Sequence, residues 1–129
     1  MKSVKTTLGG REYYLLFNGE AMFRLQDLYG EKPIFEVLAP NDRAAFGELC
    51  KVLAILAEQG ELARRQLGYD KGPMLTEEQA RALITPAEIL ALKLEVFKAV
   101  ALGYGREVED TSGAVDLVLA ELEKKEEPA

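Results

Sequence analysis

The sequence predicts an α+β fold that is mostly α-helical, with an N-terminal β-hairpin packed on a bundle of about five helices. Strand-like alternation is confined to the first 17 residues, and apolar residues at helical spacing fill most of the remainder. The chain has 129 residues, of which 48% are hydrophobic. Because a domain of this size buries roughly two-thirds of its unfolded surface, one core can form without disulfides or metals.

The hairpin is predicted over residues 2–17. Apolar and polar side chains alternate along the first strand, and Gly9-Gly10 supplies the positive φ angles that a two-residue turn requires. The returning strand, residues 11–17, is apolar on both sides. We therefore expect other elements to cover both of its faces.

Two helices are predicted next. Asn18 can cap a helix that runs to about Tyr29, and Gly30 is placed to end it with a positive φ angle. Pro33 can then open a short helical segment, residues 34–38.

The clearest amphipathic pattern follows and predicts a longer helix. It begins at Asn41 or Asp42 and runs to about Gln59. Gly60 is expected to interrupt it, residues 61–67 to add a turn or two, and residues 68–73 to form a loop.

Two capping boxes are predicted, one from Thr76 with Gln79 and one from Thr85 with Glu88. The second begins a helix over residues 86–102 whose apolar band is wider than the usual stripe. We interpret this helix as the central one, packed from more than one side.

The predicted organisation is a hairpin and helical core over residues 1–106, a polar linker over 107–113, and a last segment over 114–129. The last segment is expected to be a helix that begins near Ala114 and ends in a frayed acidic tail. No internal repeat is visible.

The composition of the chain disfavours several classes of partner and cellular location. The net charge of −6 opposes binding to nucleic acid, which is itself highly negative. A single cysteine allows no internal disulfide, and neither a secretion signal nor a membrane-spanning stretch is apparent. We expect a cytosolic protein that binds neither nucleic acid nor membranes.

No catalytic, cofactor-binding or metal-binding residue is predicted. The chain has no histidine, which removes the commonest general base and metal ligand. Cys50 lies on an apolar stripe, where burial makes a thiol inert, and the pairs of carboxylates fall at helix starts, in the linker and in the tail. Lys93 is expected to lay its stem on apolar surface with its ammonium in water, and Arg64-Arg65 to form a solvated helix face.

Four apolar residues lie away from the core stripes of their helices and are the candidates for partner binding: Phe23, Ile55, Leu102 and Leu117. Such residues often contact another protein. The alternative is that they pack on the hairpin or on a neighbouring helix of the same chain.

Residues 8–30 resemble the start of tail assembly chaperones of long-tailed bacteriophages and prophages. Those proteins share a hairpin with a glycine turn, an aromatic-aliphatic return strand, an asparagine cap and a helix that ends in glycine. The matching positions here are Gly10, Tyr13, Leu15, Phe17, Asn18, Ala21, Leu25 and Gly30.

The resemblance implies a non-enzymatic protein made in the infected or lysogenic bacterium and absent from the mature virion. Such chaperones bind the tape measure protein and help the tail tube protein to polymerise around it. The resemblance also allows a homo-oligomer and a longer frameshifted form. The alternative is another small phage or bacterial interaction module, such as a head-tail joining or regulatory adaptor, and an enzyme is the least favoured reading.

Overall fold

The fold combines a small antiparallel sheet with five α-helices in the part of the chain that the structure, a computed structural model, describes: residues 2–106 and 114–117. The described elements, in chain order, are β1 (Lys2–Leu8), β2 (Arg11–Leu15), α1 (Gly19–Tyr29), α2 (Ile34–Leu38), α3 (Arg43–Gln66), α4 (Glu77–Leu83), the 3-10 turn η1 (Pro86–Glu88), α5 (Ile89–Gly103) and β3 (Ala114–Asp116). The predicted class, α+β and mostly α, is confirmed.

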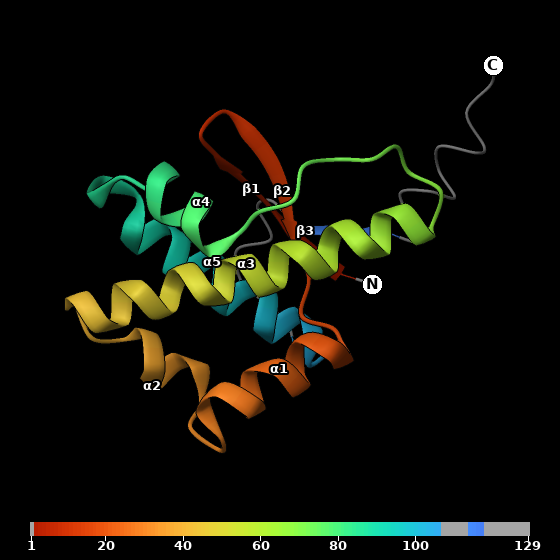
Figure 1. The fold of residues 1–129 in the computed structure, drawn as a ribbon. Helices are drawn as coiled ribbons and strands as arrows, with labels where there is room; N and C mark the ends of the chain where they lie inside the picture. The colour runs from red at the N-terminus through yellow and green to blue at the C-terminus, as the bar shows by residue number, and fades with distance from the viewer. Residues whose placement is uncertain (1, 107–113, 118–129) are drawn as a thin grey trace.

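Helix α3 organises the molecule. It contacts β2, α4, α1, α2 and α5, whereas α5 packs mainly on β1. Figure 1 shows α3 crossing the molecule, with α1 and α2 on one side of it and the hairpin and α4 on the other. The prediction that residues 86–102 form the central helix is therefore wrong, because one face of α5 carries the exposed Leu90 and Leu94.

The hairpin forms as predicted. Gly9 and Gly10 both have positive φ, which joins β1 to β2 in the register that pairs Val4 with Leu15. Leu15 lies in the main core and Leu16 in a second, smaller one, so both faces of the returning strand are covered.

The sheet has a third strand that the sequence analysis missed. Strand β3 pairs antiparallel with β1, so the strand order is β2-β1-β3 and Val115 lies opposite Ser3. The predicted helix start at Ala114 is wrong because the free edge of β1 offers this segment backbone partners that a helix pattern cannot reveal. The predicted linker, 107–113, and the tail beyond Leu117 lie outside the described residues.

Helix α3 continues through Gly60, contrary to the predicted interruption. A Cβ atom at this position would lie 1.7 Å from the carbonyl oxygen of Tyr14. The absence of a side chain at Gly60 therefore allows α3 to lie close to β2. A 3.1 Å hydrogen bond from the Leu16 amide to the Leu56 carbonyl joins the same two segments.

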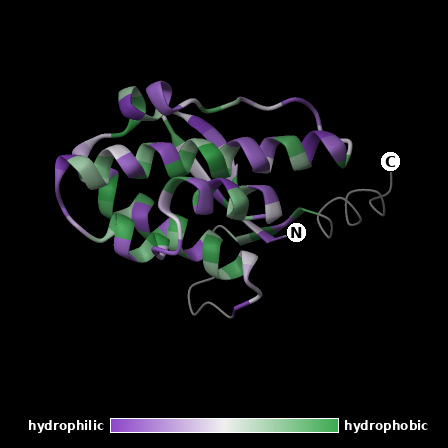
Figure 2. Cartoon of the chain, turned by 60° about the horizontal axis from the view of Figure 1, so that its bottom comes forward, coloured by the Kyte–Doolittle hydropathy of each residue, from purple (hydrophilic) through white to green (hydrophobic). Residues whose placement is uncertain are grey.

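The helix starts are set by the predicted caps in most cases. Asn18 accepts from the Ala21 amide, Asp42 caps α3, and Thr76 with Gln79 forms a full capping box. The second predicted box does not form: Thr85 makes no bond to the helix backbone, and its hydroxyl donates to the Glu88 carboxylate. Figure 2 shows hydrophobic and hydrophilic residues side by side along each helix, as amphipathic packing requires.

Candidate functional site

An apolar groove lies between α1, the turn after it, α2 and the C-terminal half of α5. It encloses about 550 Å³. Its apolar lining side chains are Phe17, Met22, Leu25, Tyr29, Pro33, Ile34, Phe35, Phe97, Val100, Ala101 and Tyr104. Its polar ones are Gln26, Glu31, Lys32 and Arg106.

Paired aromatic rings join the walls of this groove. The centroids of Phe35 and Phe97 lie 5.3 Å apart and join α2 to α5, and those of Phe17 and Tyr104 lie 5.1 Å apart. Both distances fall in the favourable range for tilted ring pairs. Phe35 is nevertheless 63% exposed and Tyr104 is 54% exposed, so each ring leaves apolar surface uncovered in the groove.

Two glycines shape the groove. Gly30 has a φ of 62°, which ends α1 and turns the chain towards α2. Gly103 lets the end of α5 approach the segment after β2, because a Cβ there would lie 2.4 Å from the Phe17 carbonyl oxygen.

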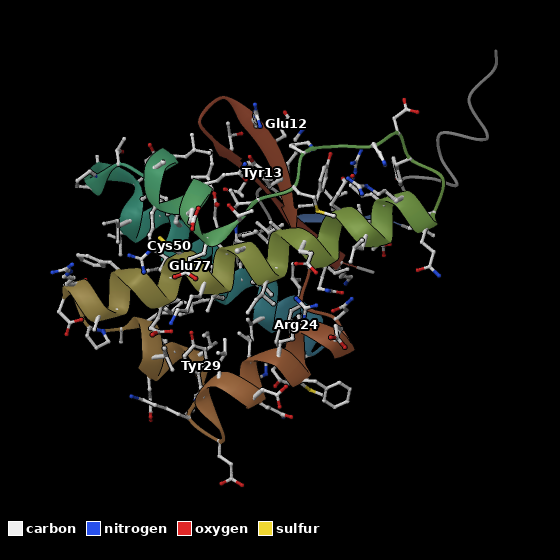
Figure 3. All side chains as sticks on the ribbon, in the orientation of Figure 1. Glu12, Tyr13, Arg24, Tyr29, Cys50 and Glu77 are labelled. Carbon is white, nitrogen blue, oxygen red and sulfur yellow. The ribbon has the colours of Figure 1, made fainter. Side chains whose placement is uncertain are left out.

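Tyr29 fixes the α1 wall to α3. Its hydroxyl donates a 2.5 Å hydrogen bond to the Glu48 carboxylate, and Figure 3 shows its side chain between the two helices. Burial, followed by this hydrogen bond, raises the pKa of the Tyr29 phenol above its ordinary value. Tyr29 therefore remains a protonated donor at neutral pH.

A second and broader depression, of about 890 Å³, lies between the start of α3 and the segment from α4 to Ile89. Its lining includes several charged side chains, among them Arg43, Lys51 and Arg81. The ring of Phe46 already lies 5.3 Å from the Lys93 ammonium. We place the candidate site in the first groove because that groove presents exposed aromatic rings.

The four residues predicted to bind a partner differ in burial and lie in different parts of the structure. Phe23 is 57% exposed on α1, outside the groove, and Ile55 is half-buried against the main core. Leu102 belongs to that core, and Leu117 is only 1% exposed in the second core with Leu16 and Ala63. The prediction that Leu102 and Leu117 lie off the core is wrong, because Leu102 packs in the main core and Leu117 packs against Leu16 and Ala63.

Sequence reasoning missed the exposed apolar residues at or near the groove, which are Phe35, Leu90, Leu94 and Tyr104. The wide apolar band of α5 was a usable signal. Such a band predicts burial from several sides, but a second stripe opposite the core stripe fits it equally well.

The Arg64-Arg65 pair is not a solvated helix face, contrary to the prediction. Both guanidinium groups donate to Glu61, which is only 4% exposed and also accepts from the Gly72 amide. Arg64 lies between two tyrosine rings, 4.9 Å from the centroid of Tyr14 and 5.0 Å from that of Tyr69. This cluster fixes the loop after α3 to the hairpin.

Burial alone would raise the pKa of the Glu61 carboxyl. Hydrogen bonds from Arg65, the Gly72 amide and Arg64 outweigh it, so the pKa of Glu61 lies below its ordinary value. The carboxylate is therefore charged at neutral pH and holds its three donors together.

Lys93 is buried, which corrects the prediction that its ammonium reaches water. Its Nζ donates to the Pro40 carbonyl at 2.9 Å and to Asn41 Oδ1 at 3.0 Å. These bonds tie α5 to the turn between α2 and α3, which is a structural role.

Cys50 is buried, as its position on an apolar stripe predicts. Burial raises the pKa of its thiol, and the nearby Arg81 guanidinium only partly opposes this. Figure 3 shows Cys50 and Glu77 where α3 and α4 meet.

Within residues 2–106 and 114–117, no three cysteine or acidic side chains come together as metal ligands. None of the described helices combines the length and the apolar character needed to cross a bilayer. Comparison with protein-family models, curated proteins and solved structures finds no match.

Proposed function

We propose that this chain is a non-enzymatic protein-binding domain whose groove holds an apolar helical segment of a partner. The exposed rings of Phe35 and Tyr104 in the groove carry this proposal. Because burying a large apolar side chain contributes roughly 1.5–3 kcal/mol, covering these two half-exposed rings would contribute about 2 kcal/mol to binding. Amphipathic helices commonly dock in grooves of this kind.

The particular function we propose is that of a tail assembly chaperone, which binds the tape measure protein and promotes assembly of the tail tube. Two observations support it. The segment that carries the resemblance, residues 8–30, includes helix α1, and α1 forms one wall of the groove through Met22, Leu25 and Tyr29. The tape measure protein expected from the resemblance is long and helical. Its helices could place apolar side chains in the apolar groove.

Co-expression tests the proposal directly. A tape measure protein encoded next to this chain is produced in fragments, alone and together with it, and the soluble and co-purified yields are measured. We expect the chain to keep at least one fragment soluble and to co-purify with it.

A matched pair of phenylalanines locates the binding site. Phe35→Ser removes an exposed ring in the groove, and Phe23→Ser removes a comparably exposed ring outside it. We expect the first substitution to abolish co-purification and the second to preserve it. If the wild-type chain neither solubilises nor co-purifies with any fragment, the chaperone function is excluded.

A further inference from the structure

The C-terminal segment of the chain, residues 118–129, begins beside the groove. Leu117 precedes this segment and packs against Leu16 in the second core. Phe17 directly follows Leu16 and lines the groove. The Tyr69 hydroxyl donates to the Leu117 carbonyl at 3.1 Å, so the point from which the segment continues is held near one end of the groove.

The segment is long enough to follow the groove. Phe97 and Tyr104, which belong to the two ring pairs of the groove, are seven residues apart and therefore roughly 10 Å apart along α5. Twelve residues follow Leu117. They span about 18 Å as a helix and up to about 40 Å when extended. Either conformation can reach from Leu117 along both ring pairs.

The sequence of the segment complements the groove. Val118, Leu119 and Leu122 are apolar and share one side at helical spacing. The segment also contains four glutamates and two lysines, which give it a charge of −2. The groove has one net positive charge, from the charged side chains Glu31, Lys32 and Arg106. Apolar residues and a charge of opposite sign favour this segment as an occupant of the groove.

We propose that residues 118–129 bind in the groove of their own chain and that a partner must displace them. The inference rests on the proposed function, since the competing partner is the apolar helix proposed there. A tethered segment has an effective concentration of the order of millimolar, about a thousandfold above that of a second copy in a micromolar solution. The chain's own segment is therefore the occupant when the partner is absent, and it covers the exposed rings until the partner binds.

Two substitutions in the full chain test the docking. Leu122→Asp places a charge on the apolar side of the segment, and Ala120→Asp places the same charge on the opposite side at helical spacing. Backbone amide resonances of the isotope-labelled variants are compared with those of the wild type without a partner. Leu122→Asp should shift the amides of Phe35, Phe97 and Tyr104, whereas Ala120→Asp should leave them unchanged.

A tape measure fragment that co-purifies with the chain tests the competition. The labelled fragment is titrated with each variant, and binding is followed by fluorescence anisotropy. Leu122→Asp should bind the fragment at least about fivefold more tightly than the wild type, because its groove is free for a larger fraction of the time. Ala120→Asp should bind it with the affinity of the wild type.

Three results would overturn the inference. Shifts confined to the neighbours of position 122, or centred on another surface, would exclude docking in the groove. Equal affinity of Leu122→Asp and the wild type for the fragment would exclude competition. Groove shifts that disappear on dilution would make a second copy the occupant. If no fragment binds either chain, the chaperone function fails, whereas groove shifts in Leu122→Asp would still support the docking.

Discussion

Two regions of the molecule differ in how their side chains are covered. One is the C-terminal end of α3, and the other is formed by α1, α2 and α5. At the first end, the buried Glu61 carboxylate is matched by Arg64, Arg65 and the Gly72 amide, and Gly60 packs directly on the hairpin. At the other end, aromatic side chains remain exposed in a groove, and Leu90 and Leu94 remain exposed on α5.

This difference predicts that the first region determines the stability of the fold and that the second determines partner binding. Substitutions at the first end remove contacts that the chain makes with itself, so they should lower the free energy of unfolding. Substitutions at the second end remove exposed side chains, so they should change partner binding with little effect on stability.

Gly60→Ala should have the largest effect, because its Cβ would lie 1.7 Å from the Tyr14 carbonyl oxygen. We expect a loss of about 3 kcal/mol or more in unfolding free energy, measured by urea denaturation. Gly47→Ala in the same helix is the control, since its Cβ would meet only the end of Arg81, 3.4 Å away. That substitution should stabilise by roughly 0.5–1 kcal/mol, and equal losses in both variants would contradict the account.

Glu61→Ala should destabilise the chain by about 2–3 kcal/mol, because it leaves two mostly buried guanidinium groups without their acceptor. Glu12→Ala is the control, since Glu12 pairs with Lys5 on the exposed side of the hairpin. That pair should contribute less than about 1 kcal/mol. A similar loss of unfolding free energy for both substitutions would show that the Glu61 ion pairs contribute no more than an exposed pair.

The Glu61 cluster also predicts a pH dependence. The pKa of Glu61 is lower in the folded chain than in the unfolded chain, so its contribution is complete above the unfolded value of about 4.3. The contribution is lost as pH falls through the lower folded pKa. Urea titrations from neutral to acid pH should therefore show a steeper loss of stability below about pH 4.3 in the wild type than in Glu61→Gln, and parallel curves would be contrary to this.

Leu117→Ala should cost about 2 kcal/mol, because Leu117 fills the second core beside Leu16 and Ala63. The Tyr69 hydroxyl donates to the Leu117 carbonyl at 3.1 Å, which fixes the end of β3 in this position. Thermal denaturation followed by circular dichroism measures the loss. An unchanged melting temperature would indicate that Leu117 is exposed, as the sequence predicted.

Leu90→Ser should have the smallest effect on stability, within about 0.5 kcal/mol, because its side chain is mostly exposed. Urea denaturation measures this change. A large loss of stability would mean that Leu90 packs in the core of the folded chain.

The sequence predicted the elements whose signals are local. Asn18, Asp42 and Thr76 cap helices where expected, and the glycine turn forms the hairpin. The features that it failed to predict depend on distant partners. Gly60 continues a helix because the hairpin lies against it, and β3 forms because β1 offers an edge.

The candidate site was less predictable than the fold. Phe23 was correctly identified as lying off the core, but Leu117 was not, because the strand that buries it was unforeseen. The exposed apolar face of α5, with Leu90 and Leu94, is visible in the sequence as part of a wide apolar band. Spacing alone cannot distinguish a helix covered on both faces from one that leaves a face open, and only the packing of β1 and α3 on one side of α5 decides this.

The most direct test is a map of the binding surface by nuclear magnetic resonance. The isotope-labelled chain is titrated with a tape measure fragment that co-purifies with it, and backbone amide shifts are followed residue by residue. The account predicts that the largest shifts occur at Phe97 and Tyr104 and at Phe35 across the groove. Shifts centred instead on the Glu61 cluster or on α4 would contradict it.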